Sequence, residues 1–233
     1  MTENHDKLRR RRLIPAALLT ILVIGTGLAA WASAGSSTTS QPGPEGVTVW
    51  NVPDLAPAPT SSSGQPIDGI TCRTVSKETV RYHVHVYVSI YVDGRQERLP
   101  AGIGITTPRL VEHTSRGVFY DVGLYDCLYW LHTHANDGII HVEAPTKGLF
   151  TLGQFFDIWG QPLSASQVGP DRGNVVVFEN GRTITGDIRA TPLSPQAVIQ
   201  IDVGSPVVAF RPITFKVTGA CGEGSNGCAV KKS

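Results

Sequence analysis

Charge of either sign is scarce in this sequence. Charged residues make up only 17% of the 233 positions, and the formal net charge at pH 7 is +1. Five of the 20 basic residues fall between Lys7 and Arg12, so the remainder of the chain is slightly acidic. Such a chain lacks the basic surface that binds a phosphate backbone, and we expect no nucleic-acid partner.

Several enzyme and metal motifs are also missing. There is no G-x-S-x-G, phosphate-binding loop or dinucleotide fingerprint, so serine hydrolases, nucleotide hydrolases and Rossmann enzymes are not indicated. Met1 is the only methionine, which disfavours a thioether copper(I) carrier. No two of the four cysteines form a C-x-x-C pair, which disfavours a four-thiolate zinc site.

An uncharged segment near the N-terminus predicts the compartment. No charged residue occurs from Leu13 to Pro44, and residues 13–34 follow a basic tail at residues 1–12. This pattern predicts a transmembrane anchor or a cleaved signal peptide, with Ala32-Ser33-Ala34 as the cleavage site. The length of the apolar stretch favours an anchor, because about 20 residues span a bilayer. Both interpretations place the rest of the chain outside the cytoplasm, either membrane-attached or secreted.

The composition divides the remainder into a linker and a domain. Residues 35–68 are rich in Ser, Thr, Pro and Gly, which predicts a flexible linker. The apolar piece Val47–Trp50 inside it is either a docked edge strand or part of the linker. Residues 69–233 form the predicted extracytoplasmic domain. Its cysteines indicate disulfides, and among three possible pairings the spacing favours Cys72 with Cys127 and Cys221 with Cys228.

Alternating hydrophobicity predicts that this domain is mainly β. Residues 80–92 alternate strictly, so that β-branched side chains share one face of a long strand and His83 and His85 share the other. Asp93-Gly94 and Asn180-Gly181 predict tight hairpin turns. Further strands are expected at residues 95–99, 109–114, 118–122, 128–134, 139–143, 175–179, 182–185, 199–203, 207–210 and 213–217.

One short α-helix is expected at residues 152–159. Thr151 and Gln154 match a capping box, and large apolar residues follow at helical spacing. The fold class predicted from these elements is an antiparallel β-sandwich or small barrel with one short α-helix, preceded by the N-terminal transmembrane or signal helix.

Histidines cluster around a hairpin signal. His132 and His134 precede Asp137-Gly138, and His141 and Glu143 follow it. With a two-residue turn, His134 pairs with His141 and His132 pairs with Glu143. Residues two apart on a strand share a face, so all four side chains are expected on one face with paired Cβ atoms about 5 Å apart.

A second histidine pair can join this patch. His83 and His85 share a strand face, so six ligands converge if that strand packs against the hairpin: His83, His85, His132, His134, His141 and Glu143. Imidazole and carboxylate groups suit a divalent transition metal such as zinc, copper(II) or iron(II). The set allows one site of three or four ligands or two neighbouring ions. The alternative is a polar network that stiffens the sheet, or a wet groove for another ligand.

The same motifs carry a family resemblance. Tyr82–His85, Leu99–Ile105, Cys127–His134, Gly138–Glu143 and Phe150–Phe156 resemble a family of uncharacterised exported or membrane-anchored bacterial and archaeal proteins. The resemblance covers roughly residues 80–205. It implies a single folded domain and carries no activity.

Three functions fit the sequence. The favoured one is an extracytoplasmic metal-binding protein that captures, buffers or transfers zinc or copper(II). The second is a metal-dependent enzyme with an open coordination position, and the third is a stalked adhesion or assembly domain without metal. Expected partners are the metal ion and, if the N-terminal helix is uncleaved, the membrane.

Overall fold

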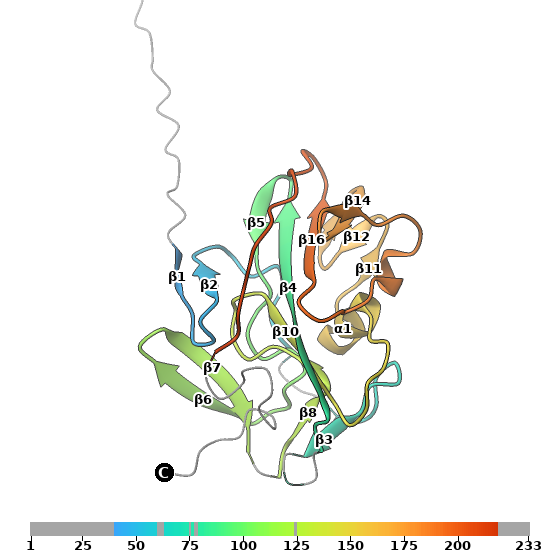
Figure 1. Ribbon diagram of the computed structural model, residues 1–233. Coiled ribbons are helices and arrows are strands. Elements are labelled where there is room, and N and C mark those ends of the chain that lie inside the picture. Colours follow the sequence, from blue (N-terminus) through green and yellow to red (C-terminus); the bar gives the residue numbers. More distant parts are fainter. Residues whose placement is uncertain (1–39, 60–62, 75, 77–78, 124, 219–233) are drawn as a thin grey trace, which may run out of the picture. The chain divides into compact units, whose positions relative to one another are not determined.

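The structure is a computed structural model that describes residues 40–59, 63–74, 76, 79–123 and 125–218 (Figure 1). The predicted basic tail and the membrane or signal segment lie outside the described residues, as do Cys221 and Cys228. Within the described part of the chain, no helix combines the length and apolar character needed to span a bilayer.

A seven-stranded sheet forms the centre of the fold, in the order β15-β14-β16-β4-β10-β9 with β5 paired to the end of β4. Its strands are β4 (Tyr82–Val92), β5 (Arg95–Glu97), β9 (Leu131–His132), β10 (Ile139–Ala144), β14 (Val175–Glu179), β15 (Arg182–Thr183) and β16 (Val198–Val203). β4 and β16 are parallel, and the other pairs are antiparallel. The prediction of a wholly antiparallel sheet is therefore wrong here, because a long crossover that includes α1 (Leu152–Trp159) joins β4 to β16.

Smaller sheets surround the central one. Their strands are β1 (Ser40–Pro42) with β2 (Thr48–Trp50), β3 (Cys72–Thr74) with β8 (Cys127–Tyr129), β6 (Arg109–Thr114) with β7 (Gly117–Val122), and β11 (Leu163–Ser164), β12 (Gln167–Val168) and β13 (Asp171–Arg172) together. The fold is mainly β with several sheets and one α-helix in the described residues, which is consistent with a β-sandwich.

The valine face of β4 packs into the main hydrophobic core. Val86 and Ile90 are fully buried and belong to the same cluster as Phe156 and Trp159 of α1. The helix begins with the predicted capping box: Thr151 Oγ1 accepts from the backbone N–H of Gln154 at 3.3 Å, and Gln154 Oε1 accepts from that of Thr151 at 3.0 Å. Alternation along β4 therefore directs one face to the core and its histidines to the other.

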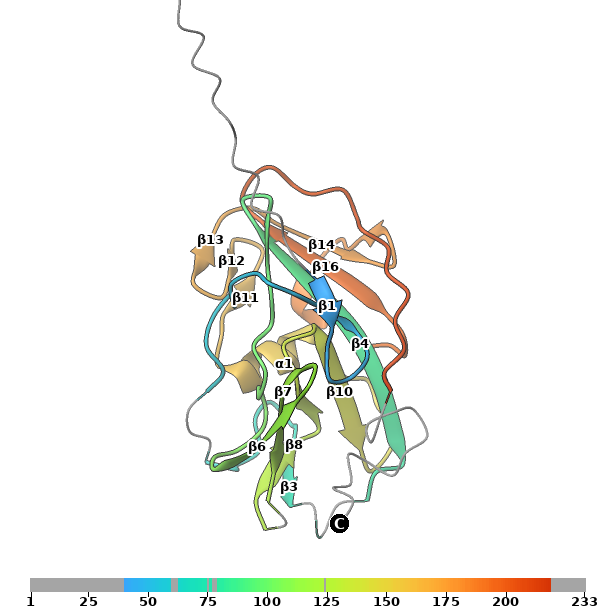
Figure 2. The same ribbon diagram turned by 90° about the vertical axis from the view of Figure 1, so that its left-hand side faces the viewer.

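Segments near both ends of the described chain cover the histidine face. Val47, between β1 and β2, joins Tyr87, Ile139 and Phe215 in a second buried cluster. Figures 1 and 2 show β1 and β2 on the side of the central sheet opposite to α1. The described part of the predicted linker is thus part of the folded unit, and the domain begins before residue 69.

The described residues after β16, 204–218, contain no strand, contrary to the prediction for residues 207–210 and 213–217. Side chains of β16 replace the backbone partners that a strand would need. The N–H of Val208 donates to Oδ1 of Asp202 at 2.7 Å, and that of Arg211 donates to Oε1 of Gln200 at 2.9 Å. These bonds hold the segment along β16 without a ladder.

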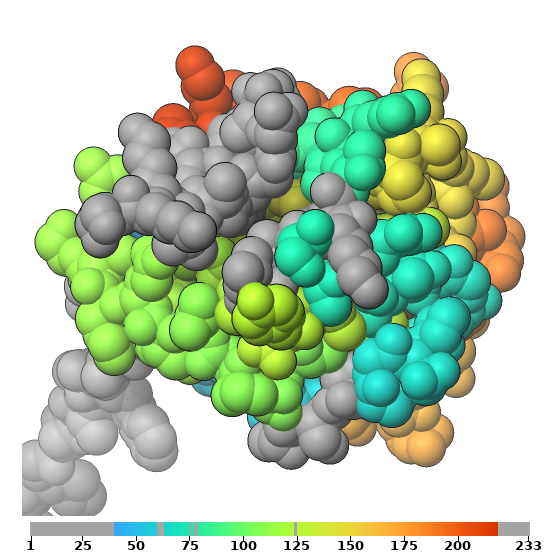
Figure 3. Space-filling model, turned by 90° about the horizontal axis from the view of Figure 1, so that it is seen from below, coloured from blue at the N-terminus to red at the C-terminus, as the bar shows by residue number. Residues whose placement is uncertain are grey.

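A disulfide links β3 to β8. Cys72 is bonded to Cys127, as favoured by the spacing, with the Cα atoms 5.5 Å apart. Figure 3 shows the neighbouring end of the molecule, where the β6–β7 hairpin, in green, lies beside segments that precede β4, in cyan and teal. The disulfide therefore anchors β8 to β3. The next strand in the chain, β9, carries His132, the first predicted ligand of the hairpin.

Candidate metal centre

Three neighbouring strands carry five of the six predicted ligands. His83 on β4 lies opposite Glu143 on β10. His85 on β4 lies opposite His141, which pairs on its other side with His132 of β9. All five side chains therefore share one face of the sheet, as the period-2 alternation predicts.

The predicted hairpin register is wrong by two residues. His132, rather than His134, lies opposite His141, because β9 ends at His132 and a wider loop replaces the two-residue turn. The side chain of Thr133 holds this loop, accepting from the N–H of Ile103 at 3.1 Å and donating to the Pro100 carbonyl at 2.8 Å. A shift of two residues preserves the face, so the ligands still converge.

The side chains form two adjoining groups. His132, His134, His141 and Glu143 each offer one ligand atom, and these atoms lie within 4.8 Å of one another. His83, His85 and His141 form the second group by the same measure. The three histidines of the first group are 0% exposed and Glu143 is 2% exposed, so the centre lies inside the protein.

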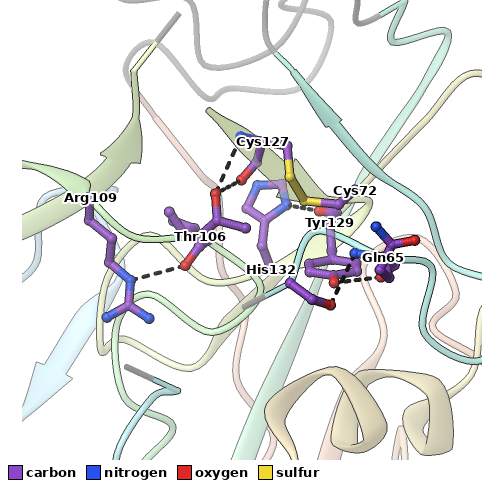
Figure 4. The surroundings of a disulfide bond; sticks show 9 residues. Gln65, Cys72, Thr106, Arg109, Cys127, Tyr129 and His132 are labelled. Atoms are coloured by element: carbon purple, nitrogen blue, oxygen red, sulfur yellow. Dashed lines mark hydrogen bonds between the residues drawn. A yellow bond between two sulfur atoms is a disulfide. The ribbon is translucent and has the colours of Figure 1, made fainter. Parts of the chain in front are cut away.

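Backbone carbonyls determine the tautomers of two histidines. Nδ1 of His132 lies 2.8 Å from the Tyr129 carbonyl oxygen (Figure 4), and Nδ1 of His134 lies 2.6 Å from that of Tyr120. A carbonyl only accepts, so each Nδ1 carries the proton and each Nε2 carries a lone pair. The two Nε2 atoms are 3.0 Å apart. Two lone pairs facing each other at this distance repel unless a cation or a proton lies between them.

Glu143 supplies the carboxylate at the middle of the cluster. Its Oε1 lies 3.1 Å from Nε2 of His83, 3.5 Å from Nδ1 of His141 and 3.9 Å from Nε2 of His132. Burial alone would raise the pKa of Glu143, but the interaction with His141 and the neighbouring imidazoles lowers it well below its ordinary value. Glu143 is therefore ionised and offers an anionic donor to a metal ion.

Glu45, which lies in the predicted linker, is a further member of the cluster that no sequence pattern predicted. Its Oε1 is 2.6 Å from Nε2 of His141, and the residue is only 1% exposed. A carboxylate behind a histidine orients the ring and leaves Nδ1 to face a metal. The available sequence signal was its isolation, since Glu45 is the only charged residue between Arg12 and Asp54.

Burial also determines the protonation states of the other titratable groups in and around the cluster. It lowers the pKa of His132 to about 4 and that of His134 well below the ordinary value, so both rings are neutral at pH 7. Two further buried acids, Asp121 and Asp137, have raised pKa values, chiefly through burial; that of Asp121 is about 6. Neutral imidazoles are the form that a metal ion requires.

The donor set fits a divalent transition metal. Three imidazoles and one carboxylate are ligands that zinc, copper(II) and iron(II) share. The buried group of His132, His134, His141 and Glu143 could therefore hold a metal ion. No family model, curated protein or solved structure matches the chain.

Proposed function

We propose that the protein is an extracytoplasmic metal-binding protein that holds zinc or copper(II) for capture, buffering or transfer. The facing Nε2 atoms of His132 and His134 carry this proposal, because their carbonyl partners direct both lone pairs to one point. His141 and Glu143 complete a four-ligand set at that point.

Burial of the ligands favours binding over catalysis on an external substrate. A cavity of about 720 Å³ lies nearby, lined in part by Tyr120 and Asn136, but none of the four ligands lines it. An ion of atomic size fits among the ligands, whereas a larger substrate in the cavity would not touch them. A metal-dependent enzyme with an open coordination position is therefore the less supported alternative.

Placement outside the cytoplasm rests on two features. The apolar segment at residues 13–34 has the pattern of an anchor or signal peptide. The Cys72–Cys127 disulfide is stable in oxidising compartments and rare in the cytosol.

Metal analysis of the purified full-length chain, in detergent and with zinc or copper(II) supplied, tests the proposal. The double variant His132→Gln/His134→Gln should bind the tightest-held ion more than about 100-fold more weakly, since it loses two ligands. His113→Gln is the matched control, because His113 is exposed on β6. A wild-type chain without bound metal, or a double variant with unchanged affinity, would contradict the proposed function.

Metal affinity should rise with pH. Burial lowers the pKa of His141, but Glu45 and Glu143 outweigh it and raise the pKa to about 10. The metal-free ring is therefore protonated at pH 7 and must release a proton to bind metal. One displaced proton changes the apparent affinity about tenfold per pH unit, so acidification from pH 8 to pH 6 weakens binding about 100-fold. Competition with a chromophoric chelator at pH 6, 7 and 8 measures this slope, and a flat profile would count against His141 as a ligand.

A further inference from the structure

The first ligand group does not use His83 and His85. Both come from β4, where they lie two residues apart and face β10. Their ligand atoms lie within 4.8 Å of one another and of one from His141. The side chain of His83 is 5% exposed and His85 is 0% exposed. Three buried imidazoles at one point form a second donor set of the kind that binds zinc or copper(II).

Glu143 lies between the two groups. Its Oε1 is 3.1 Å from Nε2 of His83, in the second group, and 3.9 Å from Nε2 of His132, in the first. His141 belongs to both groups. A carboxylate has two oxygens and can therefore bind two ions, which in such sites are about 3.5–4 Å apart. His141 can bind only one of them, through Nδ1, because Glu45 holds its Nε2.

Buried carboxyl groups surround the cluster. Four acids are buried in and around the cluster: Glu45, Asp121, Asp137 and Glu143. Among the described residues, Oε2 of Glu45 and Oδ2 of Asp137 have no hydrogen-bond partner. Buried carboxylates need compensating charge, and a second divalent ion beside the first would add it.

We propose that the cluster is a dinuclear metal centre, in which His83 and His85 hold a second ion beside the one held by His132 and His134. Glu143 serves both ions, and His141 binds one of them through Nδ1. This inference rests on the proposed metal-binding function, because the two sites share Glu143.

Zinc stoichiometry separates the two proposals. The full-length chain in detergent is saturated with Zn²⁺, passed over a desalting column and analysed for metal and protein. We expect two zinc ions per chain in the wild type and in His113→Gln, and one in His83→Gln/His85→Gln. One ion in both the wild type and the double variant would overturn the second site and leave the first intact. No zinc in the wild type would overturn both.

A second measurement covers the case in which the double variant fails to fold. Wild-type protein loaded with copper(II) is studied by electron paramagnetic resonance. Two copper(II) ions that share ligands couple magnetically, so the integrated signal should fall below the amount of copper bound. Two bound copper ions with a full, uncoupled signal, or a single bound ion, would overturn the dinuclear centre.

Discussion

Replacing Cys72 and Cys127 together with alanine is expected to lower the free energy of unfolding by about 4 kcal/mol. The disulfide closes a loop with a sequence separation of 55 residues, and its loss restores the entropy of that loop to the unfolded chain. The same change should weaken metal binding about 10- to 100-fold. β8 contains both Cys127 and Tyr129, and the carbonyl of Tyr129 orients the ring of His132 (Figure 4).

Denaturant unfolding of the metal-free proteins measures the first effect, and chelator competition measures the second. A reducing agent is the matched control, since it should destabilise the wild type more than the double alanine variant. Equal stability of the wild type and the variant under oxidising conditions would show that the disulfide contributes nothing to folding.

The variant Gly104→Ala is expected to cost about 2–5 kcal/mol of stability and to displace His132. Gly104 has φ +71°, a left-handed conformation that costs an alanine about 1–2 kcal/mol. An added Cβ would also collide with the carbonyl oxygen of Leu131 and lie 3.0 Å from Cβ of His132. Relieving such overpacking costs about 1–3 kcal/mol more and moves β9, which carries the candidate ligand His132.

Gly186→Ala is the control for this effect. Gly186 also has a positive φ, +98°, but an added Cβ there meets nothing within 4 Å. It should lose only the conformational contribution, about 1–2 kcal/mol, and keep its metal affinity. Thermal or denaturant unfolding with a metal titration distinguishes the two variants. Equal losses of stability with unchanged metal affinity in both would refute the close contact behind His132.

Local patterns predicted the elements that depend on local interactions. The alternation along β4, the Asp93-Gly94 and Asn180-Gly181 turns and the capping box of α1 all occur as expected. The strands predicted at residues 207–210 and 213–217 do not form. The side chains of Asp202 and Gln200 on β16 instead accept hydrogen bonds from the backbone N–H groups of Val208 and Arg211. The parallel pairing of β4 with β16 likewise depends on the path of more than a hundred residues between them, which no local pattern encodes.

The part of the candidate centre that depends on the two-residue alternation of side chains along strands was predictable from the sequence. Alternation places His83 and His85 on one face wherever β4 packs, and a register error of two residues leaves His132 on the correct face. Glu45 was not predictable in this way, because it lies in a turn and approaches His141 only through tertiary folding. A residue in a Pro- and Gly-rich segment has no periodicity from which its direction can be read.

The turn that contains Glu45 has a practical consequence for work with the isolated domain. A fragment starting at Gly69, where the compositional boundary lies, would lack both Glu45 and Val47. Such a fragment would uncover Tyr87 and Ile139, which pack in the same cluster as Val47, and would leave Nε2 of His141 without its carboxylate. Recombinant versions should therefore begin before Ser40, and poor solubility of a shorter version would reflect this missing cover rather than an unstable sheet.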